Sequence, residues 1–206
     1  MTEYYKLLNA DGTSPLRGFP WPLPKDGEPG EWLPPIEGDL IARKHGYHVV
    51  TLDQALAWRA SAMYRVEIDG EIINAGNKHV CRRARLLDRV EGWNAKNLRL
   101  FAADCAENVL HIFEAKFPDD DRPRTVIQAA RAFARGEIGL REMQRAADAA
   151  YAATYAADAA AYATDATHAA AHAADAAYAA THAAERKWQT ERLREYLFGD
   201  YDKANA

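Results

Sequence analysis

An alanine-rich stretch constrains this chain more than any other feature. Residues 146–184 contain 24 alanines in 39 positions and no Leu, Ile, Val, Phe, Met, Trp, Gly or Pro. Alanine has the highest intrinsic helix propensity, so the stretch is predicted to be helical. Because alanine buries little apolar area, such a helix needs a long, close contact with another helix.

The polar residues of this stretch recur at helical spacing. Six Asp and His residues form two rows in which neighbours are seven positions apart, and at 100° per residue all six fall within about 120° of one helix face. Three tyrosines form a ridge beside them. We predict that these nine residues, called the polar face below, bind a partner: Asp158, Asp165, His168, His172, Asp175, His182, Tyr151, Tyr155 and Tyr162.

Three interpretations of the polar face remain open. The first is a solvated surface, the second is a buried Tyr–His–Asp hydrogen-bond network or a partner-binding face, and the third is a metal site. For the last, Asp165, His168 and His172 have a spacing that points three ligands in one direction, and their chemistry suits zinc or iron. Because one helix alone rarely supplies a complete shell, no metal or other cofactor is predicted.

The length of the helical region also needs an explanation. No Gly or Pro occurs between Leu140 and Phe198. An unbroken helix of this length would reach about 90 Å, which is too long for a compact domain. We predict that the chain folds back as a hairpin near Thr164–Thr167, where Thr and Asp can cap a new helix. The rival is pairing with a second copy, so the protein is predicted to be a monomer or a homodimer.

Composition and charge argue against nucleic acid and membranes as partners. The net charge of −4 equals the four Asp of the alanine-rich stretch, which has no Lys or Arg. No basic patch predicts nucleic-acid binding, and no apolar run is long enough to predict a membrane span. Cys81 and Cys105 form no CxxC pair, which favours free thiols in a reducing cytoplasm.

The first 92 residues show the two-residue period of strands. Strands are predicted at 4–9, 39–43, 47–50, 63–68, 71–73 and 78–90, with a hairpin turn at Asp69-Gly70. Residues 51–54 form a capping box before a short helix. Seven of the nine prolines lie in residues 14–35. This segment is predicted to be an extended loop that wraps the domain or serves as an interaction loop.

After residue 93 the period becomes helical. Helices are predicted over about 98–117 and 122–135, the second ended by Gly136, and a third helical region opens at Gly139. The fold class is therefore α+β: a small, mainly antiparallel domain with one short helix over residues 1–92, and a helical bundle over 93–206 that includes the alanine-rich hairpin.

The helical half resembles a known family. The string RLFAADCAENVLHIFEAKFPDDDRPRTVIQAARAFARGEIG, the alanine-rich repeat and ERKWQTERLREYL together resemble immunity proteins of actinobacteria and phages, over residues 93–197. The resemblance implies a protein that binds and neutralises another protein.

The N-terminal half resembles a group of phage and bacterial domains in YKLLNADGTS, GEWLPPIEGDL, HGYHVV and YRVEIDGEI. The segments GYHVVTLDQALAW and MYRVEIDG are also similar to the middle of ADP-ribosyltransferase domains. In that family a His or Arg of the first strand binds NAD, where this chain has Tyr5 and Lys6. The resemblance implies Glu67 or Glu71 as the acid.

No GxSxG, Walker or GxGxxG motif occurs. We therefore interpret the chain as a non-enzymatic protein-binding module, a toxin-neutralising immunity protein or a phage-encoded inhibitor of a host system. The alternatives are an ADP-ribosyltransferase-like enzyme with Glu67 or Glu71, and a structural phage protein.

Overall fold

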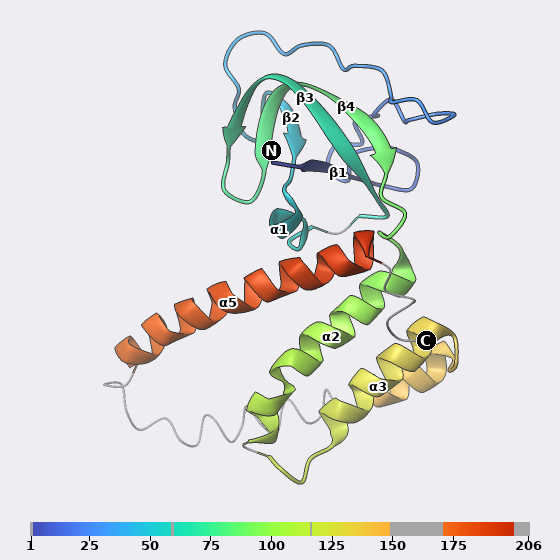
Figure 1. Ribbon diagram of the computed structural model, residues 1–206, viewed down its shortest axis with the longest axis vertical. Coiled ribbons are helices and arrows are strands. Elements are labelled where there is room, and N and C mark those ends of the chain that lie inside the picture. The colour runs from blue at the N-terminus through green and yellow to red at the C-terminus, as the bar shows by residue number, and fades with distance from the viewer. Residues whose placement is uncertain (1, 59, 116, 149–170, 200–206) are drawn as a thin grey trace. The chain divides into compact units, whose positions relative to one another are not determined.

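The computed structural model describes residues 2–58, 60–115, 117–148 and 171–199, with only the backbone described over 171–183 (Figure 1). The chain divides into two compact units, residues 1–94 with 193–206, and residues 95–192. All the described strands belong to the first unit, and the second is helical. The predicted α+β class is confirmed, whereas the hairpin predicted near Thr164–Thr167 lies outside the described residues.

A curled antiparallel sheet forms the first unit. Its strands are β1 (Tyr4–Leu8), β2 (Tyr47–Val49), β3 (Ala62–Asn74) and β4 (His79–Arg89), in the order β1-β3-β4-β2. The two edge strands also meet, because the backbones of Tyr5 and Val50 exchange hydrogen bonds of 2.8 and 2.9 Å. This closure makes the sheet a half-barrel (Figure 1).

The prediction of a hairpin turn at Asp69-Gly70 is wrong. Strand β3 continues through both residues, and its register against β4 shifts between Asp69 and Ile72. Two residues there face one on β4, which is a β-bulge, and Gly70 supplies its left-handed backbone with φ of 83°. The chain turns later, where the Ala75 N–H donates to the carbonyl oxygen of Lys78 at 2.9 Å.

The loop over residues 14–35 wraps the sheet, which is one of the two roles predicted for it. The N–H groups of Gly30 and Leu33, and of Ile36 directly after the loop, donate to three carbonyl oxygens of β4 at 2.8, 3.0 and 2.9 Å. Trp21 and Leu33 are buried in the core below. The loop thus occupies the second half of the β4 edge, while β2 pairs with the first half.

The prediction of a strand over residues 39–43 is also wrong. Residues 39–43, predicted as a strand, form a tight turn whose only bridge joins Ile41 to His45. The loop and β2 together fill the edge of β4 that faces away from β3, so this segment does not pair with β4. Arg43 adopts φ of 67° in the turn, a left-handed conformation that non-glycine residues rarely adopt and that interrupts an extended segment.

Short helix α1 (Leu52–Ala55) follows β2 and has the predicted capping box, in which the Thr51 N–H donates to Oε1 of Gln54 at 3.1 Å. The core of the first unit is apolar and includes these buried residues: Leu8, Trp21, Leu33, Val49, Ala62, Tyr64, Val66, Cys81, Ala84 and Leu86.

The second unit is built from helices α2 (Ala95–Glu114), α3 (Arg122–Arg135) and α5 (Ala171–Phe198) up to Arg192, with a further helix over residues 140–148. As predicted, α3 begins with Pro123 in its first turn and ends at Gly136, whose φ is 78°. Ala103, Leu110 and Ile127 form a buried cluster. Within the described ranges, the helices lack the combined length and apolar character of a membrane span.

The end of α5 belongs to the first unit. Leu193, Tyr196 and Leu197, near the end of this helix, are all buried. The ring of Phe198 stacks on that of Tyr5, with centroids 6.1 Å apart. The C-terminal helix therefore supplies part of the apolar packing of the strand-containing unit.

Candidate functional site

Most of the polar face lies outside the described residues. This holds for Tyr151, Tyr155, Asp158, Tyr162, Asp165 and His168, including two of the three residues of the alternative metal site. His172, Asp175 and His182 lie in α5, where the structure describes the backbone alone. Because α5 is helical through all three positions, their spacing places these positions on one side of it. The polar face stays a prediction.

The first unit contains a pocket of about 680 Å³ that sequence analysis did not predict. Strand β1, the loop around residues 14–21 and the segment from residue 43 to 50 form its wall. None of the described residues that line it is acidic. The charged and imidazole side chains are Lys6, Arg17, Arg43, Lys44, Lys78, His45 and His48, and the aromatic ones are Tyr5, Phe19, Trp21, Tyr47 and Trp58.

Lys6 is the most unusual residue of this pocket, because its side chain is only 8% exposed. Its Nζ donates to the carbonyl oxygen of His48 at 3.0 Å and lies 4.8 Å from the centroid of the Trp21 ring. Burial lowers the pKa of the Lys6 ammonium to about 8. The described residues provide it with no carboxylate.

His48 is held in its neutral form beside Lys6. Its Nε2 accepts the backbone N–H of Arg43 at 3.0 Å, which assigns the ring proton to Nδ1. Burial, and then the charges of Lys78, Lys6 and Arg17, lower the pKa of His48 to about 4. The neutral ring therefore anchors the turn that carries Arg43.

The residues implied by the ADP-ribosyltransferase resemblance separate in the structure. Tyr5 and Lys6 both line the pocket. Glu67 and Glu71 are not among its lining residues, and they pair with Arg85 and Arg82 across the sheet at 2.6 and 2.5 Å.

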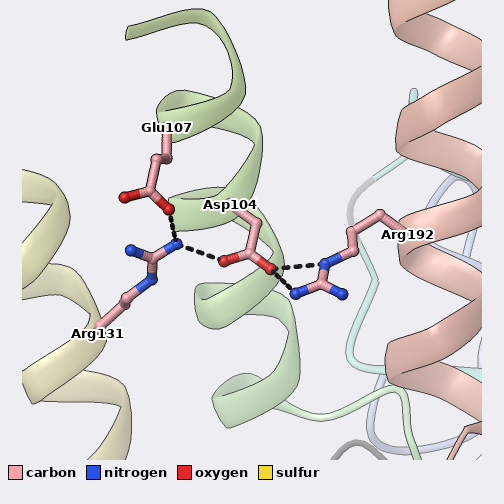
Figure 2. A network of polar contacts seen from close by, with 4 residues as sticks. All are labelled: Asp104, Glu107, Arg131 and Arg192. Carbon is pink, nitrogen blue, oxygen red and sulfur yellow. Dashed lines mark hydrogen bonds and ion pairs between the residues drawn. The ribbon is translucent and has the colours of Figure 1, made fainter. Parts of the chain in front are cut away.

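A network of ion pairs connects three helices of the second unit (Figure 2). Asp104 of α2 is 7% exposed and accepts hydrogen bonds from Arg131 of α3 at 2.7 Å and from Arg192 of α5 at 2.8 Å. Arg131 also donates to Glu107 at 2.6 Å. These hydrogen bonds, to Glu107 first and Asp104 second, raise the pKa of Arg131 above its usual value.

A second contact joins α2 to α5, where Nδ2 of Asn108 donates to Glu185 at 2.6 Å. Both contacts stabilise α5 beside α2 in the helical unit. In the part of the chain that the structure describes, no group of three or more His, Cys, Asp or Glu side chains could hold a metal ion.

Sequence reasoning missed both the pocket and the network for the same reason. Their residues are far apart in the chain, from Lys6 to Lys78 and from Asp104 to Arg192. One feature of the local sequence indicates the pocket. Lys6 interrupts the otherwise apolar strand YYKLL. A lysine between buried neighbours in a strand indicates either an ion pair or a ligand.

The geometry defines an α+β protein in which a strand-containing unit with a cationic pocket is joined to a helical unit where one buried aspartate pairs with two arginines. Residues 90–204 match the family described as "Imm-5 like putative immunity protein". The match spans more than half of the chain, and the chain belongs to this family. Neither the curated proteins nor the solved structures include a match.

Proposed function

We propose that this chain binds and neutralises a toxic effector protein, and that the polar face of its alanine-rich stretch contacts that partner. The observation that carries the proposal is the family match over residues 90–204, which contains the whole polar face. Binding to another protein is what membership of an immunity-protein family implies.

Charge favours one kind of partner. The alanine-rich stretch holds four Asp and no Lys or Arg. An acidic, tyrosine-bearing helix surface is complementary to a basic surface on the effector, and tyrosine is enriched at protein interfaces. We therefore expect the complex to form more slowly at high salt, because screening weakens the attraction that steers association.

The Asp104 network supports the proposal from within the helical unit. Its charge pairs connect α2, α3 and α5. A surface presented by α5 is then positioned before a partner arrives, which reduces the entropy lost on binding.

The test is neutralisation of the protein encoded beside the gene for this chain. That protein is expressed in a bacterial host, alone and with the full chain, and growth is measured together with co-elution of the two purified proteins. We expect arrested growth without the chain, restored growth with it, and a stable complex on size-exclusion chromatography. Normal growth in both cases, or rescue without complex formation, would refute the proposal.

A further inference from the structure

We propose that the pocket of the first unit binds a small phosphorylated molecule with a planar ring, of the nucleotide class. The proposal does not rest on the neutralising function, because all the lining residues belong to the strand-containing unit.

Unbalanced charge is the first argument. Lys6, Arg17, Arg43, Lys44 and Lys78 line one pocket, and among the described residues none of them forms an ion pair. The same unit pairs its other cations readily, since β4 alone carries three arginine–carboxylate pairs to β3. Like charges gathered without a counter-charge indicate a site that an anion completes.

The Lys6 ammonium supplies the second argument. It has three N–H donors, of which one is used by the carbonyl oxygen of His48. A buried ammonium without an anion is unfavourable, and Lys78, also buried, adds like charge nearby. A phosphate group offers several acceptor oxygens and a negative charge, so it satisfies both remaining donors.

Aromatic walls provide the third argument. The rings of Trp21 and Phe19 lie 5.8 and 6.0 Å from that of Tyr47, and Phe19 is 43% exposed. An exposed aromatic side chain beside cations suits a ligand that has a flat ring and a charged group. The pocket volume also falls within the range of small-molecule sites.

Two residues with strained backbone conformations line the same pocket. Among the described residues, Arg17, Asp26 and Arg43 are the non-glycine positions with positive φ, and the two arginines, at 70° and 67°, line the pocket. Strained conformations that the surrounding structure maintains occur preferentially at ligand sites. Arg17 and Arg43 belong to separate turns, and both line this pocket.

The direct test is calorimetric titration of the full chain with four probes: ADP, adenosine, inorganic pyrophosphate and hexaglutamate. We expect ADP to bind, pyrophosphate to bind at least about tenfold more weakly, and adenosine and hexaglutamate to show no saturable binding. Absence of ADP binding, equal affinity for pyrophosphate and ADP, or preference for the acidic peptide would overturn the proposal.

Variants localise the binding. Lys6→Met removes the buried ammonium, and Lys44→Glu reverses an exposed charge without disturbing the core. Lys25→Glu is the matched control, because its side chain is 86% exposed and lies outside the pocket. We expect both pocket variants to lose at least about tenfold in ADP affinity and the control to retain it. If Lys6→Met does not fold, Lys44→Glu decides, and equal affinities for Lys44→Glu and Lys25→Glu would overturn the proposal.

Discussion

One carboxylate, Asp104, has a larger role in the helical unit than its exposed counterparts elsewhere. It accepts hydrogen bonds from guanidinium groups on two other helices while only 7% of it is exposed. Replacing it by Asn keeps the shape and leaves Arg131 and Arg192 without their shared anion. We expect Asp104→Asn to lower the free energy of unfolding by about 3 kcal/mol in urea denaturation.

The control for this prediction is Asp88→Asn. Asp88 pairs with Arg65 at 2.7 Å, but both side chains are about half exposed. Exposed pairs contribute less than about 1 kcal/mol, so this variant should stay close to the wild type. Equal losses from the two substitutions would show that the Asp104 network does not stabilise the helices.

Gly92 allows a close approach of two backbone segments in the first unit. A Cβ at this position would lie 2.4 Å from the carbonyl oxygen of Leu197. Because backbone must then shift, we expect Gly92→Ala to lower the free energy of unfolding by about 1–3 kcal/mol. The comparison is Gly139→Ala, which meets no heavy atom within 4 Å. Because Gly139 directly precedes the helix over residues 140–148, where Gly is preferred over Ala, we expect a loss of at most about 1 kcal/mol.

Lys6 makes the stability of the protein depend on pH in an unusual direction. Burial lowers its pKa to about 8 in the folded protein, whereas an exposed lysine titrates near 10.5. Between these values the folded state has lost a proton that the unfolded state retains, so stability rises as pH increases from about 8 to 10.5. Lys78 and Cys81, which interact with Lys6, also titrate at alkaline pH, and neutral His48 does not.

Denaturation of the wild type and Lys6→Met across pH 7–10.5 isolates the contribution of Lys6. The free energy of unfolding of the wild type should increase relative to the variant as pH rises through about 8. A constant difference between the two proteins would mean that the ammonium is not desolvated in the folded state.

At the scale of single elements, local sequence signals predicted helices better than strands. Pro123 and Gly136 define the limits of α3, because both act through the backbone of the helix that they delimit. Gly70 gives an ambiguous local signal, because a glycine with a left-handed backbone fits a hairpin turn and a β-bulge equally well. Only pairing with β4, which is a nonlocal interaction, decides between them.

Arg82 anchors the long N-terminal loop to the sheet. Its Nη1 donates to the carbonyl oxygens of Ile36 and Gly38, the latter at 2.9 Å, and its Nη2 donates to Glu71. We expect Arg82→Met to release the loop and to increase the rate of cleavage within residues 14–38 in limited proteolysis. Arg65→Met, which removes an exposed pair on the same sheet, should leave that rate unchanged.

At the scale of the whole molecule, the class α+β and the change from strands to helices near residue 93 followed from periodicity. The pocket did not, because its lining comes from loops and strands between residues 5 and 78, brought together by closure of the sheet. The family relationship was visible in the helical half, since that half carries the matching residues. The polar face of the alanine-rich stretch stays a prediction that binding measurements must decide.

If the chain neutralises a protein partner through this polar face, reversing a charge on the face weakens binding. The measurement is the Kd of the partner for the wild type and for two charge-reversed variants of α5. Asp175→Lys alters the polar face. Glu191→Lys makes the same change of charge at an exposed residue that lies about 160° around the helix. We expect the Kd to rise at least about tenfold for Asp175→Lys and to stay at the wild-type value for Glu191→Lys. Equal Kd values for all three proteins would show that the polar face does not bind the partner.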